Sequence, residues 1–271
     1  MRRAAVVGTA VLLRLSRRRW VQVALAAGVA IAVVCALVAI GSHGLAREDE
    51  FRRAAAALLL LGGLALAVAL GSAALNTDAD TGALGMMAGA GASRGEVVAG
   101  AVGARVAVLA VALVAWGVVL QIGSAALGLG LDGPMAVHAL AVAEGLLLTL
   151  LACSAASSVV GPLAAGAFGV ALYVTAQAAV NLKAAADQAL IGTADAGVNL
   201  LYYVAPRTIT SPMLAELQLR DAAGAAAPRV EINGNTVLIP TSGWDSVLWT
   251  LFWCALLALA CVAGFRRRPL G

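Results

Sequence analysis

Charged residues are scarce in this sequence, and that scarcity limits the class of protein it can be. Only 12% of the 271 residues are charged, whereas 62% are hydrophobic. A water-soluble globule of this length needs more polar surface than so few charges can supply. The composition therefore indicates a protein whose main solvent is the lipid bilayer.

The sequence also lacks the residues of several enzyme and metal-binding classes. Its single lysine, Lys183, has none of the neighbouring glycines that a phosphate-binding loop requires, so ATP binding through such a loop is excluded. His43 and His138 stand alone, and the four cysteines form no CxxC pair, which argues against a metal site. We expect no nucleophile elbow and no paired aspartates within the membrane, and therefore no catalytic residues.

Charge-poor runs of roughly 20 residues indicate about six membrane-spanning helices, because that length crosses the hydrocarbon core. Helices fit these runs better than barrel strands, which would be half as long and alternating. The predicted fold class is therefore all-α. The expected spans are 20–41, 54–75, 97–122, 136–158, 162–180 and 244–264.

Basic residues gather at the membrane edges instead of forming a groove for nucleic acid, and lipid head groups are their expected partners. Arginines precede the first span and follow the last, which predicts that both ends of the chain are cytoplasmic. Residues 2–19 carry arginines among apolar residues at helical spacing, which favours an interfacial helix; the alternative is a disordered basic tail. The expected domains are 1–19, 20–180 with a cytoplasmic loop at 76–96, an external segment 181–243, and 244–271.

The external segment 181–243 is too long for a plain connector and predicts structure of its own. Ser211 and Pro212 are typical of a helix start, and Asn233-Gly234 between two β-prone triplets is a hairpin signal. We expect a small external cap that contains a short helix and a β-hairpin.

Two charged residues lie about two turns inside the predicted spans. Arg105 is placed to reach toward the cytoplasmic interface, while the carboxyl of Glu144 needs a partner or a proton in lipid. Gln177 and Asn181 of the fifth span are the expected partners of Glu144. The carboxyl is interpreted either as a structural tie between helices or as part of a substrate pathway.

The cytoplasmic loop 76–96 is too polar to span and too patterned for a linker. Asp80 with Thr81, and Ser93 with Glu96, are each positioned to start a short helix, and the second pair has the S-x-x-E spacing of a capping box. Apolar residues such as Leu84 lie between them. This pattern is typical of a docking element exposed to the cytosol.

These residues resemble the permease subunit of type 2 ATP-binding cassette (ABC) exporters. The loop after the second span carries the family's pattern in Asp80, Thr81, Leu84, Ser93, Arg94 and Glu96, followed by Gly100, although the usual Pro and Lys are replaced here. The likeness continues at Ser154 to Pro162, at Leu201-Tyr202-Tyr203 and at the basic C-terminal end.

The resemblance implies that the loop 76–96 is a coupling helix that docks on a separate ATP-binding subunit. It also implies a bacterial inner-membrane location and a second permease chain, either another copy or a related chain. ATP and Mg are then expected on the partner ATPase, with no cofactor in this chain. Two rival interpretations stay open: an ion-coupled secondary transporter built around Glu144, and a membrane scaffold or sensor that transports nothing.

Overall fold

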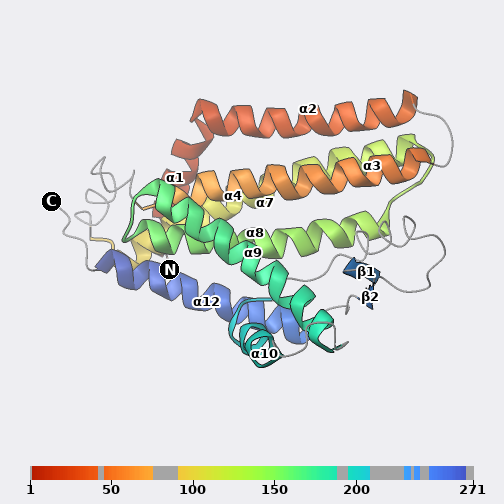
Figure 1. Ribbon diagram of the computed structural model, residues 1–271. Helices are drawn as coiled ribbons and strands as arrows, with labels where there is room; N and C mark the ends of the chain where they lie inside the picture. The colour runs from red at the N-terminus through yellow and green to blue at the C-terminus, as the bar shows by residue number, and fades with distance from the viewer. Residues whose placement is uncertain are drawn as a thin grey trace.

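The described part of the computed structural model is dominated by long helices that lie side by side (Figure 1). It covers residues 2–41, 46–75, 91–187, 195–207, 229–232, 235–238 and 244–266. Among these residues, 6 helices are long and apolar enough to cross a membrane. The all-α, multi-spanning architecture expected from the composition is therefore confirmed.

The spans follow the predicted order along the chain. The first is α2 (Arg19–Gly41), and the second is a continuous helical rod made of α3 (Ala46–Ala57), the π-helical turn η1 (Leu58–Gly62) and α4 (Gly63–Ser72). The other four are α7 (Arg94–Ala126), α8 (Gly133–Ser157), α9 (Pro162–Asp187) and α12 (Trp244–Arg266).

Helices α3, α7 and α9 extend beyond their predicted bounds, and α9 ends at Asp187 where residue 180 was expected. The second span starts in the charged run that was expected to be an external loop, since helix α3 begins at Ala46. An ion pair between Glu48 and Arg52, one turn apart at 2.7 Å, supports that polar turn. Helix α7 has 33 residues and is about 50 Å long, more than the roughly 30 Å of a hydrocarbon core. Charged residues therefore mark where the apolar, membrane-spanning part of the second span begins, although its helix already starts before them.

Small residues along the second and fourth spans pack against each other. A Cβ added at Gly71 of α4 would lie 2.6 Å from the Cβ of Cys153 and 2.7 Å from the carbonyl oxygen of Leu150, both on α8. Ala67 and Thr149 are fully buried. Such close backbone approach is how spans associate when lipid removes most of the hydrophobic drive.

Helix α1 (Arg2–Ser16) precedes the spans, so the helical alternative for the N-terminal segment is correct. Figure 1 shows α1 running across the direction of α2 at one end of the bundle. Its apolar stripe, which includes Val7 and Val11, is buried. The crossing with α7 is tight, because a Cβ at Gly100 would lie 2.6 Å from the Ala4 carbonyl oxygen. Glycine is needed at this crossing.

The segment before α12 contains a helix that the sequence analysis missed. Helix α10 (Asp195–Val204) is followed by Pro206, a usual sign of a helix end. Strands β1 (Arg229–Ile232) and β2 (Asn235–Leu238) pair antiparallel. The helix expected near Ser211 lies outside the described residues, and the external cap stays a prediction.

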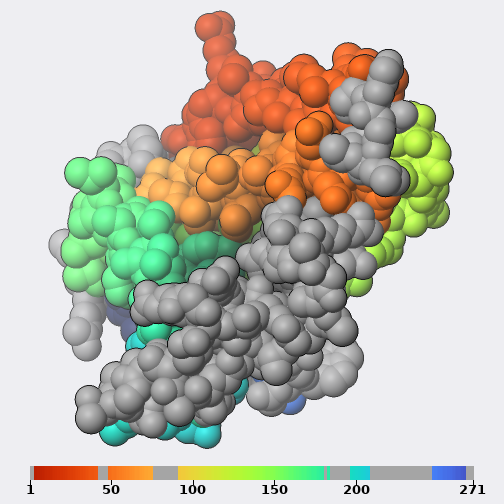
Figure 2. Space-filling model, turned by 45° about the vertical axis from the view of Figure 1, so that its right-hand side comes forward, coloured from red at the N-terminus to blue at the C-terminus, as the bar shows by residue number. Residues whose placement is uncertain are grey.

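The outer face of α2 is apolar and exposed. Figure 2 shows this helix at the molecular surface beside the second span. Large side chains along its length, such as Ile31, Leu37 and Val38, are about half exposed or more. In a protein that spans a membrane, such a face is covered by lipid. The buried residues of α2, including Gly28 and Ala32, form the side that packs toward α7.

Candidate functional site

The start of α7 is built as a capping box, as the S-x-x-E spacing predicted. The Ser93 hydroxyl accepts a hydrogen bond from the backbone N–H of Glu96 at 3.2 Å, and the Ser93 N–H donates to the Glu96 carboxylate at 2.9 Å. Each side chain satisfies a backbone donor that the helix itself cannot. The cap fixes where the loop ends and the third span begins.

Arginines join this helix start to two other parts of the chain. The Arg94 guanidinium donates to the carbonyl oxygen of Arg266, at the end of α12, over 2.5 Å. Arg3 of α1 donates to the carbonyl oxygen of Gly91, whose φ of +84° lies in the left-handed region that favours glycine. The residues around the start of α7 are thus tied to α1 and to α12.

The six residues expected to couple to an ATPase fall into two sets. Ser93, Arg94 and Glu96 lie together at the start of α7. Asp80, Thr81 and Leu84 lie outside the described residues. Arg94 is engaged within the chain, a role that the sequence did not indicate.

The expectation that no nucleophile elbow occurs needs correction at the level of sequence. Residues 91 to 95 read Gly-Ala-Ser-Arg-Gly and so have the GxSxG spacing. In the structure the Ser93 hydroxyl is held by the cap, 3.0 Å from the Glu96 carboxylate. A hydrolase of the Ser-His-Asp type would have a histidine beside that serine. The described histidine, His138, lies on α8 and bonds to the backbone of Ala56 on α3. Capping accounts for the spacing.

An ion-paired cluster lies where α3, α7 and α8 meet, and the sequence analysis missed it. The Arg52 guanidinium contacts the Asp132 carboxylate at 2.7 Å and the Glu48 carboxylate at 2.7 Å. The Asp132 side chain is only 1% exposed. Its second oxygen accepts from the N–H of Met135, so the same carboxylate caps α8. The sequence did indicate part of this cluster, because Glu48 and Arg52 are opposite charges one helical turn apart near the same end of the spans as Asp132.

Gln121 of α7 completes this cluster. Its side-chain amide donates to the carbonyl oxygen of Asp132 at 2.9 Å and accepts from the Asp132 N–H at 2.9 Å. In the loop between α7 and α8, Asp132 is therefore held through its backbone by Gln121 and through its side chain by Arg52. Such a two-point connection fixes the distance between the two helices.

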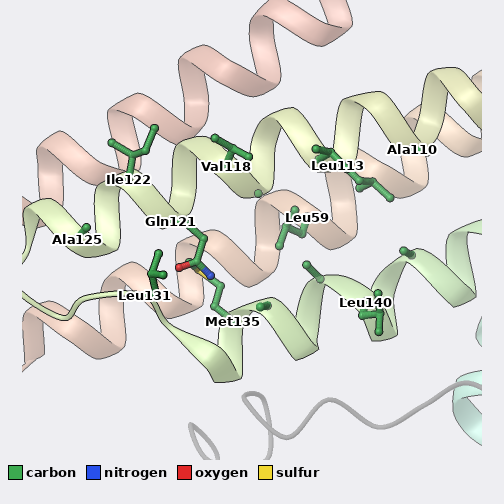
Figure 3. A pocket seen from close by; sticks show the side chains of 15 residues that line it. Leu59, Ala110, Leu113, Val118, Gln121, Ile122, Ala125, Leu131, Met135 and Leu140 are labelled. Carbon is green, nitrogen blue, oxygen red and sulfur yellow. The ribbon is translucent and has the colours of Figure 1, made fainter.

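A groove of about 620 Å³ runs beside this cluster, between α7, α8 and the π-helical turn of the second span (Figure 3). Its lining is almost wholly apolar, with Gln121 as the polar side chain. Figure 3 shows Leu59, Val118, Met135 and Leu140 around the hollow. π-helical turns inside α-helices often occur at functional sites. The groove can hold an apolar chain, and its apolar lining residues are Leu59, Ala110, Leu113, Val114, Gly117, Val118, Ile122, Ala125, Leu131, Met135, Ala136, Ala139, Leu140 and Ala143.

Arg105 lies inside the protein rather than in lipid. The residue is 2% exposed, and its guanidinium donates to the Ala101 carbonyl oxygen at 2.8 Å. Ala101 is one turn closer to the start of α7, so the side chain points toward the end of the bundle where α1 lies. That this end is the cytoplasmic one, as the sequence analysis expected for Arg105, stays a prediction.

Glu144 lies midway along α8, half-buried, and interacts electrostatically with Cys254 of α12. The amide of Gln177 donates to the hydroxyl of Tyr173 on its own helix at 3.1 Å. Asn181 belongs to α9, but its side chain is outside the described residues. The structure thus brings Glu144 close to α12, a neighbour that the sequence analysis did not name.

The fold and these sites define a multi-pass helical membrane protein. Within the described part of the chain, no group of three or more His, Cys, Asp and Glu side chains could hold a metal ion. No protein-family model matches the chain, and no curated protein matches it.

Proposed function

We propose that this chain is the membrane-spanning permease subunit of an ATP-driven exporter of the type 2 ABC class. The contacts around the start of α7 carry the proposal. Residues 91 to 96 are the last residues of the loop that resembles a coupling helix, and they are bonded to α1 through Gly91 and to α12 through Arg94. A push on the loop by a partner would therefore act on three helices at once.

In this mechanism the chain supplies a pathway and no bond chemistry. A separate ATP-binding subunit hydrolyses ATP with Mg, and its closure moves the loop 76–96. Two permease chains then switch between inward-facing and outward-facing arrangements. The apolar groove beside Gln121 is a candidate contact for apolar parts of a substrate, since pockets of this kind are the usual binding sites.

The proposal includes an orientation. Arginines cluster at the end of the bundle that holds α1, the start of α7 and the end of α12, and the positive-inside bias makes that end cytoplasmic. Both chain ends then lie in the cytoplasm of a bacterium, and the spans cross its inner membrane. Cysteine-accessibility labelling of intact cells at Glu50 and at Arg17, in a cysteine-free background, tests this arrangement.

Co-purification with a candidate ATPase encoded beside this chain tests the function. We expect the ATPase to co-purify through a tag on this chain, and its activity in lipid to rise. The test variant combines Asp80→Lys with Leu84→Glu, which changes the expected docking surface and leaves the Ser93 cap intact. Loss of co-purification in this variant supports the proposal.

A matched control replaces Glu50, an exposed residue at the opposite end, with Gln. This variant should retain both the ATPase and its stimulation. A wild-type chain that purifies alone and stimulates no ATPase would contradict the proposal.

A second candidate function, an ion-coupled transporter, is favoured by the carboxyl of Glu144 inside α8. Ionisable groups within spans are costly and often functional. Glu144→Gln separates the two functions. A proton-coupled transporter loses uptake driven by a pH gradient, whereas the ATP-driven exporter keeps its ATP-dependent stimulation within about twofold, as expected when no transition-state contact is lost.

A further inference from the structure

Helix α1 continues into a short basic stretch that we name the arginine segment, residues 14 to 19. Arginines occupy positions 14, 17, 18 and 19, and no acidic residue occurs among residues 1 to 47. Arg17 and Arg19 are exposed in the structure. The segment concentrates positive charge from the last turn of α1 to the first residue of α2, the first span.

The position of α1 places this charge at the level of lipid head groups. Helix α1 runs across the spans and crosses α7 at Gly100, six residues or about 9 Å from the start of α7. Helix α7 is about 20 Å longer than a hydrocarbon core requires; shared equally between its two ends, this excess places about the first 10 Å of the helix outside that core. A helix that crosses it there lies in the interface.

The two flanks of α1 differ in the way an interfacial helix requires. Arg3 and Arg14 are eleven residues, or about three turns, apart and therefore share one flank. Ala5, Thr9 and Leu12 lie on the other flank and line a hollow of about 400 Å³ against α7. The hollow extends along α7 to Ala107, toward the middle of the spans. One flank thus suits head groups and the other suits acyl chains.

Apolar side chains beside the arginine segment also suit a membrane. Leu13 is 54% exposed and Trp20, directly after the segment, is 38% exposed. Tryptophan is enriched at membrane interfaces because its ring is apolar and its N–H is polar. An acidic protein partner would not need these exposed apolar groups at the spans' ends.

We propose that the arginine segment is a binding site for anionic phospholipids of the leaflet that contains α1. The guanidinium groups of Arg17 and Arg19 attract the lipid phosphates, and Trp20 lies beside the bound head groups. The site keeps α1 against the membrane and selects acidic lipids over zwitterionic ones. It does not depend on the proposed transport function.

Fluorescence of Trp20 in the reconstituted full-length chain tests this site. Dibrominated phosphatidylglycerol and dibrominated phosphatidylcholine are compared as quenchers in phosphatidylcholine vesicles, and a Trp20→Phe chain supplies the background of the other tryptophans. We expect phosphatidylglycerol to be preferred beside Trp20, and the preference to fall about fivefold for each arginine removed, the effect of one basic residue near an anionic surface.

The test variant is Arg17→Gln with Arg19→Gln, and its matched control is Arg17→Lys with Arg19→Lys. The Gln pair should lose the preference and the Lys pair should keep it, because the attraction acts on charge. Salt gives a second measurement on the wild-type chain. Raising NaCl from about 0.1 M to about 1 M shortens the Debye length from about 10 Å to about 3 Å and should remove the preference.

Equal quenching by the two lipids in the wild-type chain would overturn the proposal, because the segment would then not distinguish anionic from zwitterionic lipid. A preference that survives in the Gln pair, or one that persists at high salt, would overturn it as well.

Discussion

The two ends of the helical bundle carry charge in opposite ways. At the end with α1, Arg3 and Arg94 donate to backbone carbonyl oxygens, and Arg17 and Arg19 are exposed. At the other end, the Arg52 guanidinium is shared between two carboxylates, and the Asp132 carboxylate is buried. The first end keeps its net positive charge, and the second end neutralises its charges internally.

This difference indicates what each end can do. The exposed Arg17 and Arg19 attract anionic lipids or an acidic surface of a partner, so the first end is suited to recognition. Buried, paired charges lose much when one partner is removed, so the second end is suited to holding helices in place. The predictions that follow test this division, starting with the paired end.

The largest effect is expected at Asp132. Asp132→Ala removes the ion pair and the cap of α8, and we expect the free energy of unfolding to fall by about 4 kcal/mol. Asp132→Asn keeps a capping oxygen and loses only the charge, so it should cost about 3 kcal/mol. Unfolding in mixed detergent micelles measures both. Glu50→Gln, at an exposed position on α3, should change the free energy of unfolding by no more than about 0.5 kcal/mol. A loss as large as that of the Asp132 variants would contradict the role of the paired charges in holding the helices.

The next effect concerns the crossing of α1 and α7. A Cβ at Gly100 would meet the backbone of α1, so Gly100→Leu should cost about 2 kcal/mol and speed amide hydrogen exchange in α1. Gly103→Leu is the matched control, because nothing lies within 4 Å of a Cβ there. Equal exchange of α1 in the two variants would show that the crossing does not hold α1.

A smaller effect is expected at the capping box. Ser93→Ala removes the acceptor for the Glu96 N–H and should cost about 1 kcal/mol. Ser93→Asp retains an acceptor and should restore stability. Hydrogen exchange in the first turn of α7 measures this local effect. Unchanged exchange in the alanine variant would mean that the cap contributes little to the start of the helix.

The spans could be predicted from the sequence because bilayer thickness imposes a length on apolar runs. Their ends could not, since helices such as α3 continue through charged turns outside the hydrocarbon. Helix α10 was missed because, within the segment 181–243, a helix start was expected only at Ser211 and Pro212. The capping box at Ser93 was predictable because it depends on two residues three apart.

The ion-paired cluster depends on residues that are far apart in the sequence. Arg52 and Asp132 are separated by 80 positions, and Gln121 reaches the same loop from α7. A single sequence indicates that these groups lie near span ends, but not which of them meet. The Arg94 contact with Arg266 has the same character, because its acceptor is a backbone carbonyl and carries no sequence signal.

The smallest effect on stability and the sharpest test of the basic end come from Arg94. Arg94→Gln removes its charged hydrogen bond to the carbonyl oxygen of Arg266. An exposed interaction of this kind should contribute no more than about 0.5 kcal/mol to the free energy of unfolding.

If the contact between Arg94 and Arg266 transmits movement of the loop to α12, Arg94→Gln should still co-purify with the ATPase but lose most of the ATPase stimulation. Arg94→Lys keeps the charge and should retain part of it. Loss of co-purification would instead place Arg94 in the docking surface itself, and unchanged stimulation would show that α12 moves independently of the loop.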